Sequence, residues 1–239
     1  MNSEKSFMCS HSESSCNAKK DRLDKQFAFI LEADKEKLIE RQIYLSAPVQ
    51  LAECSENETD AKNNAGNGTL RKENDAEHAW HLALMTILLQ EYANEPIDVL
   101  KTVTMVLLHD IVEIDAGDTY AYDEAGKADQ KAREEAAAQR IYGMLPKDQA
   151  EKMYAIWKEF EKRKTPEAKF ARAMDNLQPM MLNHAADGRA WEEHGVFLGQ
   201  ILKRNVPTPE GSKVLWEYAK EHFLEPSVKT GRIKKDCEL

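Results

Sequence analysis

The sequence contains few of the residues that make turns, with only 10 glycines and 8 prolines among 239 residues. A β-sandwich or a β-barrel needs many turns, so this scarcity argues against both architectures. Val and Thr never cluster into alternating runs, and no convincing strand is predicted. Ala, Glu, Lys, Leu and Gln dominate the middle of the chain instead, and these residues favour helices. The sequence therefore predicts an all-α protein.

Other absences narrow the class of protein. No apolar run approaches the length of a membrane span, and the polar N-terminus lacks the apolar core of a signal peptide. The four cysteines have neither the spacing of zinc ligands nor that of a small disulfide framework, which is typical of reduced thiols. A net charge of −9 argues against the basic face that duplex nucleic acid requires. We expect a cytoplasmic protein that binds no membrane and no duplex, whereas a small anionic substrate stays open.

Composition and periodicity predict the organisation of the chain. Residues 1–20 are expected to be a disordered tail, residues 21–225 a single helical domain, and residues 226–239 a basic C-terminal tail. Within the domain, residues 46–70 lose all periodicity and are interpreted as a loop insertion. Helical patterns are expected near residues 24–45, 74–93, 96–113, 128–144, 147–164, 165–183, 190–204 and 212–224.

Two of the expected helices carry residue types that bind metals. His78 begins an apolar stripe and should therefore point inward, although a lone histidine on such a face is more often a satisfied core residue. The next helix is more specific, because the apolar run before His109 and Asp110 leads into three ionisable side chains, with Glu113 one turn later on the same arc. Burying these groups without compensation is costly. A bound metal ion and a metal-free histidine–carboxylate pair would each compensate.

A further acid, Asp175, lies in the otherwise apolar segment FARAMDNLQPMML. A carboxylate on such a face needs either a bound ion or a paired lysine or arginine. Pro179 cannot donate a hydrogen bond to the carbonyl of Asp175, so the helix is expected to kink or loosen there.

Taken together, these residues resemble the HD superfamily of metal-dependent phosphohydrolases. The metal-binding signature of that family runs H…HD…D, in the order of His78, His109-Asp110 and Asp175. The segment RKENDAEH is similar to the R-x-E-N-x-x-E-H pattern of the 5′-deoxynucleotidase branch, and HDIVE followed by Gly117-Asp118 keeps its HD-x-x-E-x-x-x-G-D spacing. The resemblance follows the helix order over about residues 24–224.

The resemblance implies an HD-domain bundle of about seven helices and one divalent metal ion, held by the two histidines and the two aspartates of the signature. Such a set of nitrogen and oxygen ligands suits Mn, Co, Fe, Ni or Zn better than Ca, and Mg is a further candidate. By similarity, Glu113 acts on the attacking water or the leaving-group oxygen, and Asp118 holds the sugar of the substrate or a water molecule. The resemblance also implies a homodimer.

In the same branch, an Arg-Trp pair upstream of the R-x-E-N segment binds phosphate and sugar. The nearest equivalents here are Arg41 and Tyr44, separated from the segment by the insertion. A solvated helix charge explains Arg41 equally well.

The predicted function is a metal-dependent phosphomonoesterase that releases phosphate from (deoxy)nucleoside 5′-monophosphates. One alternative is an HD-type hydrolase of nucleotide triphosphates or pyrophosphates. It would need an extra basic patch, which the sequence lacks unless Arg133, Arg140 and Arg172 fold inward. The other alternative is a helical regulator that binds metal or nucleotide without turnover.

Overall fold

The computed structural model describes residues 4–46, 71–117 and 129–236. The described chain is helical almost throughout, which confirms the all-α prediction. Its α-helices are α1 Glu4–Ala33, α3 Asp75–Leu89, α4 Val99–Leu108, α5 Glu113–Ala116, α6 Gln130–Tyr142, α7 Lys147–Lys162, α8 Pro166–Ala185, α9 Arg189–Glu193, α10 Leu198–Arg204, α11 Thr208–Gly211, α12 Lys213–Ala219 and α13 Glu225–Lys229. Short tight or wide turns occur at η1 Asp34–Leu38, η2 Gln90–Tyr92 and η3 Lys220–Leu224, and two strands at β1 Glu40–Tyr44 and β2 Lys72–Asn74.

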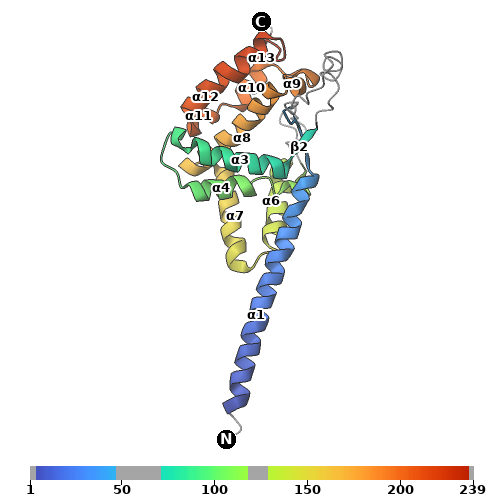
Figure 1. The fold of residues 1–239 in the computed structure, drawn as a ribbon, viewed down its shortest axis with the longest axis vertical. Coiled ribbons are helices and arrows are strands. Elements are labelled where there is room, and N and C mark those ends of the chain that lie inside the picture. The colour runs from blue at the N-terminus through green and yellow to red at the C-terminus, as the bar shows by residue number, and fades with distance from the viewer. Residues whose placement is uncertain (1–3, 47–70, 118–128, 237–239) are drawn as a thin grey trace, which may run out of the picture.

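Helix α8 is the centre of the molecule (Figure 1). It packs against α3, α4, α7 and the C-terminal helices, and it is buried along most of its length. The side chain of Thr165 caps its start and Pro166 takes the first helical position, as predicted from the sequence Thr-Pro-Glu. The helix continues through Pro179 to Ala185. Because every neighbouring helix contacts α8, polar side chains on it can meet groups from several parts of the chain.

Helix α3 begins with a capping box. The side chain of Asn74 accepts from the backbone N–H of Glu77, and the Glu77 carboxylate accepts from the backbone N–H of Asn74. The prediction that Asn74 or Asp75 starts this helix is therefore confirmed. This start sets the inward direction of His78, one turn into the helix.

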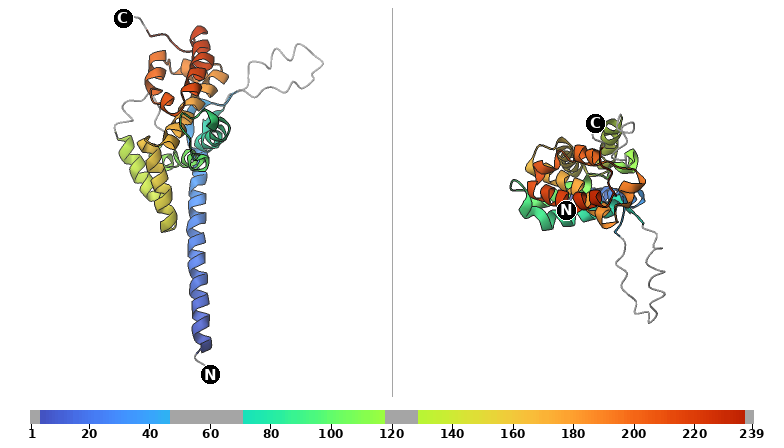
Figure 2. Two further views of the ribbon diagram at one scale, coloured as in Figure 1. Left: turned by 90° about the vertical axis from the view of Figure 1, so that its left-hand side faces the viewer. Right: turned by 90° about the horizontal axis from the view of Figure 1, so that it is seen from above.

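Helix α1 is longer at its start and shorter at its end than predicted. It begins at Glu4, where a disordered tail was expected up to residue 20, and it ends at Ala33 rather than near residue 45. Figures 1 and 2 show its N-terminal half extending away from the body. The later part is attached to the body by a bidentate ion pair from Arg22 to Asp148 and by stacking of Phe29 on Tyr142.

The expectation that the chain contains no strand was wrong. Strands β1 and β2 pair in antiparallel orientation, with Glu40 opposite Asn74 and Tyr44 opposite Lys72. The sequence pattern does not reveal these strands because they are very short and because their stability comes from partners distant in sequence, including a buried ion network around Arg41. The pairing delivers Arg41 to the start of α3.

Two further boundaries differ from the predictions. The helix expected to reach Glu113 ends at Leu108, and tight turns connect it to α5. Residues 226–236 were expected to belong to a tail, yet Ile233 is buried in the core and Lys234 pairs with Phe197. Most of the predicted insertion and the loop after Gly117 lie outside the described residues. None of the helices in the described part of the chain combines the length and apolar character that a bilayer crossing demands.

Candidate metal centre

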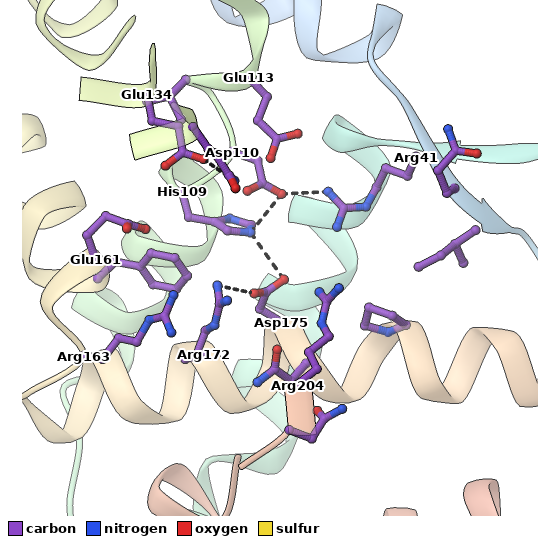
Figure 3. Close-up of a pocket in the computed structure, with 18 of the residues that line it drawn as sticks. Arg41, His109, Asp110, Glu113, Glu134, Glu161, Arg163, Arg172, Asp175 and Arg204 are labelled. Carbon is purple, nitrogen blue, oxygen red and sulfur yellow. Dashed lines mark hydrogen bonds and ion pairs between the residues drawn. The ribbon is translucent and has the colours of Figure 1, made fainter. Parts of the chain in front are cut away.

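Four predicted side chains converge where α3, α8 and the end of α4 meet. Nε2 of His78 lies 3.2 Å from Oδ1 of Asp175 and 3.8 Å from Oδ2 of Asp110. Nε2 of His109 lies 3.0 Å from Oδ2 of Asp110 and 3.7 Å from Oδ1 of Asp175. Figure 3 shows the ring of His109 between the two carboxylates. The structure therefore brings together the two histidines and both aspartates, and Asp175 points toward the histidines.

The outer nitrogens of both imidazole rings are engaged. Nδ1 of His109 lies 2.9 Å from the carbonyl oxygen of Val106, which can only accept a hydrogen bond. Nδ1 of His78 lies 3.1 Å from Oε1 of Gln178, while Nε2 of Gln178 donates to Glu73 at 2.5 Å. Each Nδ1 thus carries a proton, which leaves Nε2 of each ring as the nitrogen that faces the carboxylates of Asp110 and Asp175. This second-sphere arrangement is the usual one for metal-bound histidine.

The buried carboxylates of the cluster favour positive charge on the groups beside them. Burial disfavours a charged His109, but the carboxylates of Asp110 and Asp175 outweigh it and raise its pKa to about 10. Burial likewise disfavours ionisation of Asp175, yet Arg172 and the two histidines hold its pKa well below the ordinary value. Two buried carboxylates thus stay ionised beside two imidazole nitrogens.

The residues therefore fit a divalent metal ion. Nε2 of His109 is buried and lies 3.0 Å from Oδ2 of Asp110, but no contact within the described part of the chain gives it a hydrogen bond of good geometry. Atoms of His78, His109 and Asp110 lie close enough together to share one ion, and Asp175 approaches both histidines. Two nitrogen and two oxygen donors form a set that transition metals accept.

The substrate-binding predictions for Arg41 and Tyr44 meet different surroundings. Arg41 is buried, and its Nη1 donates to Asp75 at 2.9 Å and to Asp110 at 2.8 Å. It lines the cavity beside the cluster, so the alternative of a solvated helix charge is wrong. The hydroxyl of Tyr44 donates instead to Glu193, and Arg189 lies over its ring. The described cavity lining includes Arg41 but not Tyr44.

A cavity of about 630 Å³ opens beside the cluster, and this volume is of the size of small-ligand sites. Glu113, predicted to be catalytic, lies in its wall and is almost fully buried. One carboxylate oxygen of Glu113 lies within 4.8 Å of oxygens of Asp110 and Asp75. Asp118, predicted for catalysis and substrate binding, lies outside the described residues.

Basic side chains from several elements reach the same cavity. Figure 3 shows Arg163 after α7, Arg172 on α8 and Arg204 on α10 around it. Arg172 donates to Asp175 at 2.9 Å, and partial burial together with Arg172 lowers the pKa of Arg163. The cavity lining thus carries three arginines, with the acids Glu134 and Glu161 beside them, so positive charge is available to a phosphorylated ligand despite the acidic net charge.

Sequence reasoning missed the residues that orient the ligands. Gln178 lies one turn beyond Asp175 on α8, and that spacing was the one available signal. Glu73 lies within the RKENDAEH segment that carries the family resemblance, but the sequence predicts no role for it. Of the three arginines considered for an inward position, Arg172 lines the cavity, whereas Arg140 pairs with Asp115 and Glu32, and Arg133 bonds to Asp129.

The all-α fold and this buried histidine–aspartate cluster define a helical protein with side chains that fit a divalent metal ion. Residues 62–216 match the HD domain family. The chain therefore belongs to the HD domain family, which confirms the family predicted from the sequence.

Similar proteins agree with this assignment. A predicted metal-dependent phosphohydrolase from Magnetospirillum magnetotacticum MS-1 is 40% identical, with a TM-score of 0.76 over 89% of this chain and 96% of that one. The 5′-deoxynucleotidase HDDC2 of Danio rerio and that of Homo sapiens are each 28% identical, over 47% and 46% of this chain and 54% and 53% of their own lengths. The chain thus spans about half the length of the curated relatives it matches. The PH0347 protein from Pyrococcus horikoshii OT3, 16% identical with a TM-score of 0.51, shares the fold.

Proposed function

We propose that this protein is a metal-dependent phosphohydrolase that releases phosphate from (deoxy)nucleoside 5′-monophosphates. The observation that carries the proposal is the convergence of His78, His109, Asp110 and Asp175 beside a cavity of about 630 Å³ with arginines in its wall. The names of the HDDC2 relatives supply the substrate class. We assign the four side chains as ligands of one divalent ion, with Mn, Co, Fe, Ni, Zn and Mg as candidates.

The side chains around the cavity suit this chemistry. An ion held by the four ligands would offset phosphate charge and polarise the phosphoryl group. Glu113 lies beside Asp110 in the cavity wall, which supports our assignment of its carboxylate as the group that takes the proton of an attacking water molecule. Arg172 pairs with Asp175 and can share its remaining donors with a phosphate oxygen. Arg41 and Asp118 remain our proposals for substrate binding, as does the more remote Tyr44.

One observation favours a second candidate, the hydrolysis of a nucleoside triphosphate or a pyrophosphate. The basic patch that this reaction would require is present, since Arg163, Arg172 and Arg204 all line the cavity. The two reactions differ in their products, because the first releases phosphate and the second can release pyrophosphate.

The test uses the full chain, stripped of metal by chelation and reloaded with each candidate ion. Phosphate and pyrophosphate are measured from a panel of nucleoside mono- and triphosphates, and bound metal is measured by elemental analysis. We expect the wild type to release phosphate from monophosphates. In His109→Ala we expect the rate of phosphate release to fall by about 100-fold or more, and the bound metal to be lost as well. The exposed His222→Ala serves as the matched control and should behave as the wild type. Release of neither product with any ion, at full metal occupancy, would exclude both hydrolytic candidates and leave a non-catalytic binder.

We also propose that the protein forms a homodimer in the cytoplasm. Exposed apolar residues on α1 and on α3 support the dimer.

A further inference from the structure

The cavity continues beyond the metal cluster along the second half of α8. We refer to this part as the α8 arm, and its walls are formed by Asn176, Pro179, Met180, Asn183, Ala190, Trp191, Ile201, Arg204 and Asn205. Asn176 and Asn183 are seven residues apart and therefore share one face of the helix. Asn183 lies about 12 Å beyond Asp175 along the helix axis. A ligand that reaches from the cluster to Asn183 thus has the length of a nucleotide, not that of a free phosphate.

A chain of hydrogen bonds fixes the orientation of the Asn176 amide. Nδ2 of Asn205 donates to the carbonyl oxygen of Ile201 at 2.8 Å, and that oxygen can only accept. Oδ1 of Asn205 therefore accepts from the hydroxyl of Thr208 at 3.1 Å, and this hydroxyl accepts in turn from Nδ2 of Asn176 at 3.0 Å. Oδ1 of Asn176 is left without a hydrogen-bond partner among the described residues.

The Asn183 amide is fixed in the same way. Its Nδ2 donates to the carbonyl oxygen of Pro179 at 2.9 Å, and its Oδ1 has no hydrogen-bond partner in the described part of the chain. Asn176 is 2% exposed and Asn183 is 6% exposed. A buried acceptor that is left unsatisfied costs about 1–3 kcal/mol, so a ligand that brings a donor to it is favoured by a comparable amount. The arm thus contributes two acceptors, both on the wall made by α8.

We infer that the α8 arm binds the nucleoside part of the substrate, an inference that rests on the proposed function. Oδ1 of Asn176, next to the ligand Asp175, accepts a hydrogen bond from a sugar hydroxyl. Oδ1 of Asn183, two turns further on, accepts one from an amino group of the base, while Trp191 and Met180 offer apolar surface to its ring. The favoured substrates are nucleoside 5′-monophosphates whose base carries an amino group.

The test compares two substrates that differ only in that amino group, deoxyadenosine 5′-monophosphate and purine deoxyriboside 5′-monophosphate. We expect the wild type to prefer the first in kcat/KM by about 10-fold, the worth of one hydrogen bond. In Asn183→Leu the ratio of the two kcat/KM values should approach one, whereas Asn183→Asp, which keeps an oxygen acceptor, should retain a preference. A wild type without preference, or an unchanged ratio in Asn183→Leu, would overturn the inference.

Two measurements separate this inference from the proposed function. Calorimetric binding of the two free nucleosides to the wild type probes the arm without turnover, and it also decides the matter if Asn183→Leu fails to fold. Phosphate release at equal rates from both nucleotides, with equal binding of the nucleosides, would support the phosphohydrolase activity and contradict nucleoside binding by the α8 arm. Tighter binding of deoxyadenosine without phosphate release from any nucleotide would support nucleoside binding by the α8 arm and contradict the phosphohydrolase activity.

Discussion

Glu36 is a buried acid close to the cluster. It lies in η1, is 7% exposed, and its Oε1 has no hydrogen-bond partner in the described chain. Its pKa is raised from 4.5 to about 8, mainly by burial and secondly by the negative charge of Asp110. The metal-free protein therefore keeps this carboxyl protonated well above the pH at which an exposed glutamate ionises.

This shift predicts a pH dependence of stability in the metal-free protein. Because the pKa is raised on folding, the contribution of Glu36 is fully present below about pH 4.5 and is lost as the pH rises through 8. Glu36→Gln should remove that loss, so its free energy of unfolding should exceed that of the wild type at pH 9, by up to about 5 kcal/mol. Urea denaturation of chelated protein from pH 4.5 to 9 measures the effect. If the free energies of unfolding of the two proteins changed in parallel with pH across this range, Glu36 would not titrate in this window.

Gln178 determines which nitrogen of His78 is free to bind. Its amide accepts from Nδ1 of His78 and donates to Glu73, so the two bonds fix each other. In Gln178→Met, which has a similar size and no amide, we expect metal affinity to fall by about 10–100-fold. Titration calorimetry with the preferred ion measures this loss. Gln149→Met, a remote glutamine that bonds to Gln26, is the matched control, and equal affinity in both variants would contradict the role of Gln178.

At the level of elements, local signals predicted the helices that carry the site. The capping residues of α3 and the Thr-Pro start of α8 act through neighbours within four residues, so the sequence alone reveals them. The end of α4 was wrong because a helical wheel assumes one continuous helix, whereas tight turns after Leu108 redirect the chain. Strand β1 escaped prediction because its pairing with β2 and its ion pairs involve residues at least 28 positions away.

The same distinction explains what could be foreseen of the site. The order of His78, His109-Asp110 and Asp175 is a pattern along the chain, and the structure brings these residues together. The roles of Gln178 and Asn176 depend on which atoms of other helices meet their amides. Such hydrogen bonds leave no periodic trace in the sequence, so they required the three-dimensional arrangement.

At the level of the whole molecule, two helices expose apolar stripes. On α1 the stripe consists of Leu23, Phe27, Ile30 and Leu31, and on α3 of Trp80, Leu84, Ile87 and Leu88, all at least 40% exposed. Both sets recur at spacings of three and four residues, which is the pattern of a helix that packs against another helix. The α1 stripe lies on the later part of the helix, beside the body, and still faces outward from its own chain. Apolar patches of this kind mark interaction sites, and a second copy offers two such stripes of matching helical geometry.

We therefore expect α1 of one copy to pack on the exposed stripes of the other around a two-fold axis. Light scattering after size-exclusion chromatography should give the wild type twice its chain mass of 27.3 kDa. Phe27→Glu combined with Ile30→Glu places two charges in the α1 stripe and should yield a single chain, because burying unpaired charges in an apolar interface is costly. Val206→Glu, at a position that is 68% exposed and outside both stripes, should remain a dimer. A wild type that keeps the mass of one chain at every concentration tested would show that the stripes serve something other than self-association.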